Sequence, residues 1–326
     1  MKKLKVILIG AGHRGSYYTG LMKEMPEKYE IVAVAEPIKT RREYIVERDN
    51  LSPENVFESW EPLLEKGKIA DVAVVSTMDR DHFAPAVRAM ELGYDLLLEK
   101  PVCPTPGECA SLYKKAEECG VRAIVCHVLR YTDFFKKMKE CIDSKMVGDV
   151  ISIEHTEAVG NVHQSHSFVR GNWGNSKKSS FMLLQKSCHD LDILQWLLGK
   201  ECKKIQSFGA LTHFKRECAP EGSPEYCIEG CPKADECYYN AVKLYYEDKE
   251  NKWFRTTATA NANPTDEEVL KSLKETQYGK CVYKCDNDVV DHQTVNMLFE
   301  DDITVTFSMN AFNKGGREET HQVVFQ

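Results

Sequence analysis

The sequence predicts an α/β fold whose first half is a doubly wound parallel sheet. Two observations predict this sheet: strand patterns alternate with helical patterns from residue 1 to about 127, and a glycine-rich turn follows the first apolar run. Such alternation is typical of parallel sheets with helices on both faces. The chain has 326 residues, which is long for one hydrophobic core. We therefore expect two domains, at 1–127 and 128–326.

The elements of the first half have clear boundaries. Gly93 and Gly120 fall where C-terminal helix caps belong, and Pro106 falls at the start of a helix. The expected strands are 4–9, 30–36, 55–57, 69–76, 94–99 and 121–127, and the expected helices are 13–25, 38–48, 59–66, 80–92 and 105–119.

The turn after the first strand carries three glycines, Gly10, Gly12 and Gly15, with His13 and Arg14 between the last two. In a dinucleotide-binding turn the first glycine permits the tight turn, the second lets the backbone approach a pyrophosphate, and the third allows the helix to pack closely on the strand. Phosphate would bind at the helix N-terminus near His13. The motif therefore predicts a Rossmann domain, with a plain structural turn as the alternative.

The second strand ends at Glu36, about twenty residues beyond the glycines. A carboxylate in this place can bind the ribose hydroxyls of NAD and repel a 2′-phosphate. Arg41 and Arg42 lie nearby in the sequence and could turn toward such a phosphate. We therefore expect NAD as the cofactor, with NADP possible.

Two further polar clusters follow later strands of the same sheet. Thr77 and His82 come after the strand at 69–76, and Glu99, Lys100 and Pro101 come at the end of the strand at 94–99. Ligands bind at the carboxyl ends of parallel strands, so we expect these residues in the cofactor site. A solvated strand end is the alternative for Glu99 and Lys100.

Composition argues against several classes of partner. The formal net charge is −7 without a sustained basic face, which argues against nucleic acid. No apolar stretch reaches the length of a membrane span, and the apolar run after Met-Lys-Lys is too short for a signal peptide. We expect the 13 cysteines to be mostly reduced, and the protein to be cytoplasmic.

In the first half, the sequence resembles the Gfo/Idh/MocA family of NAD(P)-dependent oxidoreductases, which includes glucose–fructose oxidoreductase and inositol dehydrogenase. The glycine motif, Glu36, the pair Thr77 and His82, and above all Glu99-Lys100-Pro101 carry the resemblance. It implies that a second α/β domain, with an open and mainly antiparallel sheet, holds the substrate site and forms a homodimer or homotetramer. It also implies that Lys100 lies beside the nicotinamide and contacts the reacting hydroxyl.

A helix is expected at 182–199, with Lys186, His189 and Asp190 on a polar face. Without the resemblance, Lys186 and Asp190 would form an ordinary i,i+4 pair on a solvated face beside a surface histidine. The family pattern for this helix is Asp-x-Gly-x-His-x-x-Asp, whose last two positions match His189 and Asp192. The resemblance thus implies that His189 is the acid–base and that Asp192 belongs to the substrate site.

The first two positions of this pattern differ. Gln185 and Ser187 stand where the family has Asp and Gly, which puts an aspartate-assisted proton relay in doubt. We therefore expect Lys186 to take part in catalysis.

A loop before this helix is rich in hydrogen-bonding and aromatic side chains: His163, His166, Arg170 and Trp173. They could bind a polyhydroxylated or anionic substrate, with Trp173 facing sugar C–H groups. A plain surface loop would look the same, and a histidine metal site lacks a suitably spaced carboxylate. We expect substrate contact.

Four cysteines lie in a Pro- and Gly-rich stretch: Cys218, Cys227, Cys231 and Cys237. Four thiolates are sufficient for a tetrahedral structural zinc, although the spacing is not that of a standard finger. Free thiols, a disulfide and an iron–sulfur cluster are the alternatives.

The remaining pattern is uneven. We expect a helix at 133–146, strands at 150–155 and 204–214, a helix-like stretch at 238–247, and an antiparallel pair of strands at 293–299 and 303–309. Residues 248–287 have no clear pattern. The chain stops in a strand-like run at 321–326, without the closing elements that the resemblance implies, so we expect a C-terminal truncation.

These expectations combine into an NAD(P)-dependent oxidoreductase that moves a hydride between nicotinamide and a secondary hydroxyl of a sugar, polyol or glycoside. His189 would exchange the hydroxyl proton while Lys100 polarises the oxygen, in a cleft between the two domains. An NAD-dependent redox-assisted glycosidase and a non-catalytic nucleotide-sensing protein are the alternatives.

Overall fold

The computed structural model describes residues 2–146, 148–314 and 322–324. The chain forms two compact units, one of residues 1–126 with 250–269, and the other of 127–249 with 270–326. The first unit is therefore discontinuous in sequence, which a single boundary after residue 127 does not describe. Of the strand-like run at 321–326, residues 321, 325 and 326 lie outside the described residues.

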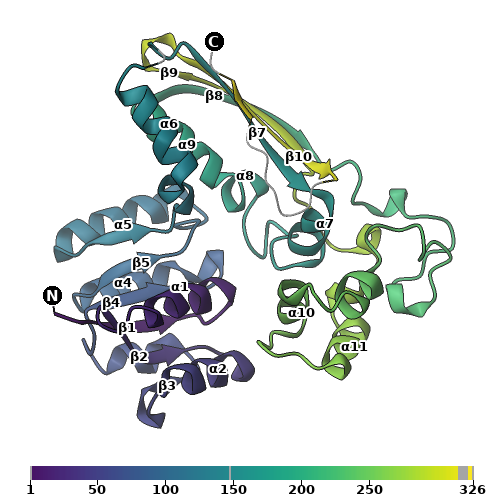
Figure 1. Ribbon diagram of the computed structural model, residues 1–326, viewed down its shortest axis with the longest axis horizontal. Coiled ribbons are helices and arrows are strands. Elements are labelled where there is room, and N and C mark those ends of the chain that lie inside the picture. Colours follow the sequence, from purple (N-terminus) through teal and green to yellow (C-terminus); the bar gives the residue numbers. More distant parts are fainter. Residues whose placement is uncertain (1, 147, 315–321, 325–326) are drawn as a thin grey trace. The chain divides into compact units, whose positions relative to one another are not determined.

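The first unit contains a six-stranded parallel sheet in the order β3-β2-β1-β4-β5-β6 (Figure 1). Its order reverses beside β1, so the carboxyl ends of β1 and β4 lie at the switch point where such sheets bind ligands. The strands are β1 Leu4–Ile9, β2 Tyr29–Ala35, β3 Val56–Phe57, β4 Val72–Val75, β5 Asp95–Leu98 and β6 Ala123–Val125.

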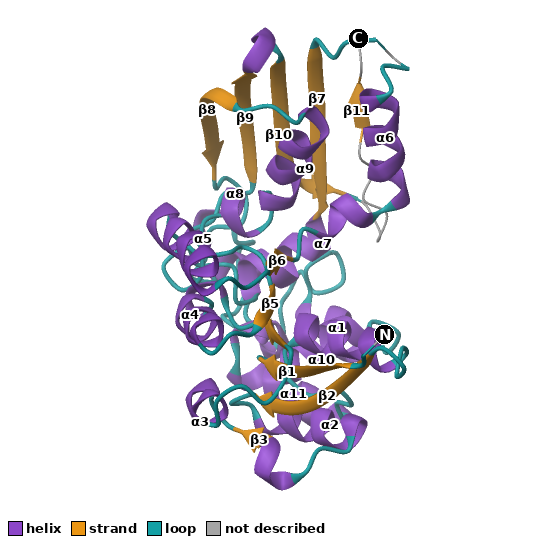
Figure 2. Ribbon diagram, turned by 90° about the vertical axis from the view of Figure 1, so that its left-hand side faces the viewer, coloured by secondary structure: helices purple, strands orange, loops and turns teal. Residues whose placement is uncertain are grey.

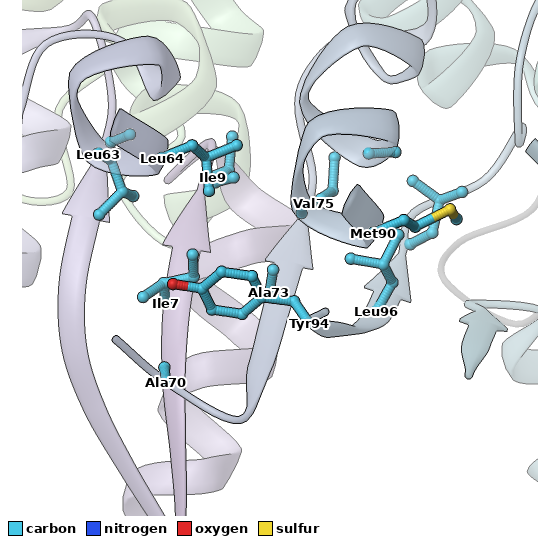
Figure 3. Packing of buried hydrophobic residues seen from close by; sticks show 14 of the residues in the cluster. Ile7, Ile9, Leu63, Leu64, Ala70, Ala73, Val75, Met90, Tyr94 and Leu96 are labelled. Carbon is cyan, nitrogen blue, oxygen red and sulfur yellow. The ribbon is translucent and has the colours of Figure 1, made fainter. Parts of the chain in front are cut away.

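Helices connect these strands, as parallel pairing requires. They are α1 His13–Lys23, α2 Lys39–Asp49, α3 Trp60–Glu65, α4 Phe83–Glu91 and α5 Pro106–Cys119. Residues on one face of the sheet pack against α3, α4 and α5, with Ile7, Ala73 and Leu96 in the same cluster as Leu63 and Met90 (Figure 3). The other face packs against α1 and α2 through a cluster that contains Leu8, Val34 and Ile45.

The second unit contains a five-stranded mixed sheet in the order β11-β7-β10-β9-β8 (Figure 2). Only β7 and β10 pair in parallel, and the other neighbours are antiparallel. This confirms the mainly antiparallel sheet that the resemblance implied. The strands are β7 Ser152–Gly160, β8 Cys202–Ala210, β9 His292–Phe299, β10 Thr304–Asn313 and β11 Gln322–Val324.

Helices cover one face of this sheet. Leu194 of α9 and Met182 of α8 share a buried cluster with sheet residues such as Phe307, and Phe135 of α6 packs on the other side of α9. The helices are α6 Asp133–Asp143, α7 Asn161–His163, α8 Met182–Gln185 and α9 Cys188–Leu198, with π-helical turns at Gln164–Arg170 and Val242–Glu247.

Three segments differ from the expected elements. The helix expected at 182–199 is interrupted at Lys186 and Ser187, where α8 ends before α9 begins. The stretch around 163–170, expected as a loop, is helical and largely buried. The unpatterned stretch 248–287 holds two helices, α10 Lys252–Thr259 and α11 Asp266–Glu275, whose amphipathic patterns are short and separated by polar residues.

Candidate active site

The glycine turn has the close packing that the motif predicts. Gly10 has a positive φ of 88°, and a Cβ there would lie 2.6 Å from the Ser76 carbonyl oxygen. A Cβ at Gly15 would lie 2.1 Å from the Gly10 carbonyl oxygen. Neither clash is tolerable, so both positions require glycine. At Gly12, by contrast, only Arg41 Nη1 comes within 4 Å of such a Cβ, at 3.8 Å, so the backbone is open to a ligand.

Glu36 is held at the end of β2 by backbone donors. Its Oε2 accepts a hydrogen bond from Ala11 N at 2.6 Å, and its Oε1 accepts one from Ile38 N at 2.9 Å. The residue is 3% exposed. Arg42 donates to the Glu36 carbonyl oxygen and to Glu58, so its guanidinium is engaged within the protein. These contacts fix a carboxyl group beside the glycine turn.

Thr77 and His82 lie beyond the end of β4 and contact each other. Thr77 Oγ1 lies 2.9 Å from His82 Nδ1. Burial lowers the pKa of His82 to about 4, with the nearby Lys100 charge as a lesser cause in the same direction. His82 Nε2 is buried and has no hydrogen-bond partner among the described residues. A neutral imidazole can donate or accept a hydrogen bond at a nitrogen that has no protein partner, and His82 lies at the edge where such sheets bind ligands.

Glu99 and Lys100 follow β5, the next strand in the sheet. Tyr18 of α1 donates a hydrogen bond to Glu99 Oε2 at 2.7 Å, and Glu99 is 7% exposed. Burial, followed by the Glu99 charge, raises the pKa of Tyr18. Glu99 therefore ties the end of β5 to α1, while Lys100 continues into a cis peptide bond with Pro101.

In the second unit, two polar pairs join β7 to the helices that carry His189. His155 Nε2 lies 2.8 Å from Asp190 Oδ1, and Glu157 Oε1 lies 2.7 Å from Lys186 Nζ. All four side chains are at most 13% exposed. Lys186 and Asp190 thus pair with the strand rather than with each other on a solvated face. Neither His155 nor Glu157 could be recognised from the sequence as a site residue, because their partners lie about thirty residues away along the chain.

Asp192 accepts two hydrogen bonds from an arginine that sequence reasoning also missed. Arg130 Nε donates to Asp192 Oδ2 at 2.7 Å and Nη2 donates to Oδ1 at 2.5 Å. His127 Nε2 lies 3.7 Å from the same Oδ1. The His127 ring also meets His189 edge to face, with centroids 6.1 Å apart at 87°. His189 therefore stands in a group with His127 and the Arg130–Asp192 pair.

The residues proposed for substrate contact at 163–173 mostly face the protein interior. His166 Nδ1 lies 2.8 Å from the Tyr245 hydroxyl, and burial lowers the pKa of His166 to about 3. Arg170 is fully buried and donates to the carbonyl oxygens of Lys280 and Tyr239. These contacts give both side chains partners within the protein, and a role for them in substrate binding stays a prediction.

His163 and Trp173 are half-buried at the same place. Both rings pack against Phe168, with centroid distances of 5.7 Å and 6.4 Å. The Trp173 carbonyl oxygen accepts a hydrogen bond from Gln185 Nε2 at 2.7 Å. A role for these two residues in substrate binding stays a prediction.

The four cysteines do not form the expected zinc site. Cys227, Cys231 and Cys237 line one cavity together with Cys281 and Arg170. Cys218 is exposed, and its thiol contacts the Thr212 carbonyl oxygen. Across residues 2–146, 148–314 and 322–324, no three His, Cys, Asp or Glu side chains are grouped as metal ligands. A structural zinc is therefore not supported by the described residues.

None of the helices in the described part of the chain combines the length and the apolar character that crossing a membrane requires.

Comparison with known sequences gives two matches that together span most of the chain. Residues 4–127 match the oxidoreductase family with an NAD-binding Rossmann fold, and residues 139–325 match its C-terminal alpha/beta domain. The inositol 2-dehydrogenase of Salmonella typhimurium is 20% identical over 206 residues, which are 63% of this chain and 57% of that protein. The 2,7-anhydro-N-acetylneuraminate hydratase of Mediterraneibacter gnavus is 25% identical over 209 residues, 64% of this chain and 53% of that protein. The chain thus spans about half the length of these relatives.

Solved structures share the fold. The scyllo-inositol dehydrogenase of Lactobacillus casei, with bound NAD(H) and scyllo-inositol, aligns with a TM-score of 0.65 at 14% identity, covering 99% of this chain and 72% of that chain. The WlbA dehydrogenase of Chromobacterium violaceum, in complex with NADH and UDP-GlcNAcA, aligns with a TM-score of 0.67 at 13% identity, covering 100% and 72%. With both of its domains matched, the chain belongs to the Gfo/Idh/MocA oxidoreductase family.

Proposed function

We propose that the protein is an NAD-dependent dehydrogenase that acts on a secondary hydroxyl of a sugar or polyol. The observation that carries this proposal is the order of functional groups along the first sheet. Three neighbouring parallel strands, β1, β4 and β5, end in the glycine turn, the Thr77–His82 pair, and Glu99 with Lys100. A dinucleotide bound along this edge would place its reactive ring near a lysine.

When NAD⁺ is bound, it accepts the hydride that leaves the substrate carbon. The protein must then remove the hydroxyl proton and stabilise the negative charge that develops on oxygen. We assign proton removal to a ring nitrogen of His189 and charge stabilisation to the ammonium group of Lys100. The carbon–oxygen bond becomes a carbonyl as the hydride and the proton leave.

Lys186 has a more limited role in this proposal than the sequence suggested. Its ammonium group lies 2.7 Å from Glu157 Oε1, and the lysine side chain is 13% exposed. This ion pair holds the ammonium group in place beside β7. We therefore propose that Lys186 acts as a fixed positive charge near His189, whereas the proton moves through His189.

Relatives support the substrate class. One of the matched proteins is named an inositol 2-dehydrogenase, and one of the similar structures contains scyllo-inositol with NAD(H). Cyclic polyols and sugars both carry secondary hydroxyl groups next to several further hydroxyl groups. A site with histidines and the Arg130–Asp192 pair offers donors and acceptors for such neighbouring hydroxyls.

A second candidate is a reaction without net oxidation, in which the dinucleotide stays bound and is reoxidised in each turnover. The 25% identity to a protein named as a hydratase supports this second candidate. It would use the same residues, since oxidation of a hydroxyl to a carbonyl makes the C–H bond of the adjacent carbon acidic, and loss of that proton expels a leaving group from the next carbon before the hydride returns to the carbonyl carbon.

The first experiment is a screen of inositols, sugars, uronic acids and glycosides with the purified protein and NAD⁺. A dehydrogenase produces NADH in step with the oxidised product. The second candidate produces an elimination or hydrolysis product without accumulation of NADH. Stereospecific transfer of deuterium from labelled NADH to a carbonyl product would support the dehydrogenase directly. Tight binding of NAD⁺ without turnover of any compound would instead favour a nucleotide-sensing protein.

A further inference from the structure

The segment 250–269 belongs to the first unit, although it follows more than a hundred residues of the second unit in sequence. Its helix α10 begins after Asn251, whose side chain accepts a hydrogen bond from Phe254 N. Phe254, Arg255 and Ala258 are buried, and Arg255 Nη2 lies 2.7 Å from Asp266 Oδ1. The segment is therefore an ordered piece of the unit that contains the glycine turn.

This segment contacts the first turns of two helices, α1 and α2, which follow the glycine turn and Glu36. The Trp253 ring lies 6.4 Å from the His13 ring, centroid to centroid, at 48°. Thr40 Oγ1 donates to the Ala260 carbonyl oxygen at 2.8 Å. His13 directly follows Gly12, and Thr40 lies four residues after Glu36. The two contacts are thus made by opposite ends of α10 to the first turns of α1 and α2.

The Trp253 side chain does not lie on the buried side of α10. Its indole is half-buried, whereas the next residue, Phe254, is 3% exposed. Arg41 Nη1 is the group nearest to a Cβ placed at Gly12, 3.8 Å away. An indole and a guanidinium therefore border the stretch of backbone that a pyrophosphate approaches. Such a pair suits a ligand with an anionic and a flat apolar part.

We propose that Trp253 is a cofactor-binding residue that packs against the adenosine diphosphate half of the bound dinucleotide. The proposal rests on the proposed NAD-dependent function, and it adds a contact that comes from outside the glycine motif. The nicotinamide half is excluded because the ends of β4 and β5, with His82 and Lys100, provide the site for that ring. The adenosine half lies toward Glu36 and Thr40, where the Ala260 contact also falls.

The test is direct titration of the full-length protein and of Trp253→Ala with NAD⁺, ADP-ribose and nicotinamide mononucleotide. Loss of a stacked aromatic ring should weaken NAD⁺ and ADP-ribose by a similar factor, on the order of tenfold. Nicotinamide mononucleotide should bind both proteins equally. Trp253→Phe, which keeps a ring, should recover much of the loss. Lys252→Ala, a change of the exposed neighbour on the same helix, is the matched control.

A second readout separates contact from folding. Tryptophan excitation should produce NADH emission by energy transfer, and this signal should fall more in Trp253→Phe than in Trp60→Phe or Trp196→Phe, each measured at saturating NADH. Equal affinity of wild type and Trp253→Ala for ADP-ribose would overturn the inference, as would a loss confined to nicotinamide mononucleotide. If the wild-type protein binds neither NAD⁺ nor NADP⁺, the proposed function itself fails.

Discussion

Glu157 and Lys186 form an ion pair that is nearly closed to solvent, with Oε1 and Nζ 2.7 Å apart and the glutamate side chain 2% exposed. Two residues earlier on β7, His155 pairs with Asp190, four residues after Lys186. Residues 155 and 157 point to the same face of the strand. The two pairs therefore join one face of β7 to the helices around His189, and they fix the position of that histidine.

Glu157→Gln should destabilise the second unit by about 3 kcal/mol, because it leaves the Lys186 charge buried without its partner. Chemical unfolding monitored by fluorescence measures this change. Glu154→Gln is the matched control, since Glu154 lies on the same strand with its side chain exposed. The double change Glu157→Gln with Lys186→Met should recover part of the stability. An unchanged stability in the single variant would show that the pair contributes nothing.

Lys100→Met and His189→Ala should each lower kcat by about a hundredfold or more, since each removes a group that acts on the reacting hydroxyl. Affinity for NAD⁺ should change little, because neither residue alone holds the dinucleotide. Steady-state kinetics with a substrate from the screen, together with titration of NAD⁺, measures both effects. If His189→Ala retains nearly full kcat, the proton moves through another group, and Lys186 is the first to test.

NAD⁺ should bind more tightly than NADP⁺ by roughly tenfold or more, because a 2′-phosphate would meet the Glu36 carboxyl group. The carboxyl group has little freedom to move away, since Ala11 N and Ile38 N both donate to it. Glu36→Ser should reduce the difference in affinity between NAD⁺ and NADP⁺. Direct titration with both cofactors decides the matter, and a preference of the wild-type protein for NADP⁺ would contradict it.

Acid should destabilise the first unit through His82. Burial lowers the pKa of His82 to about 4 in the folded chain, whereas an unfolded histidine titrates near 6.5. Between these values the unfolded state binds more protons, so the free energy of unfolding falls as the pH falls from about 6.5 to about 4. His82→Gln should flatten this dependence, measured by urea unfolding at several pH values. His292→Gln, with a side chain 44% exposed, is the control, and an identical slope in both variants would refute the assignment.

The sequence was informative where function depends on local geometry. The glycine turn, Glu36 and the residues after β4 and β5 could be placed because each follows directly from a strand end and its turn. The pattern of apolar residues indicates the helix around His189, but it does not indicate that the polar residues Lys186 and Asp190 are buried against β7. Lys186 and Asp190 are spaced as a surface pair, and only the fold brings Glu157 and His155 to them.

Arg170 and His166 show a second limit. A run of polar residues favours a surface loop, and nothing near it in sequence indicates burial. Their partners are the carbonyl oxygens of Tyr239 and Lys280 and the hydroxyl of Tyr245, which lie 69 to 110 residues away along the chain. The zinc prediction is not supported for a related reason. The spacing of four cysteines in the sequence shows that enough ligands are present, but it does not show that the folded chain groups them around one metal ion.

The return of residues 250–269 to the first unit also bears on how the protein is made and dissected. During synthesis the Rossmann sheet can form once residue 126 has left the ribosome, but α10 becomes available only after the following 123 residues have been added. The nucleotide-binding unit is therefore completed late, with part of the second unit already emerged. A fragment cut at residue 127 would keep the glycine turn and Glu36 but lose the contacts to His13 and Thr40, so it is not an equivalent of the intact unit.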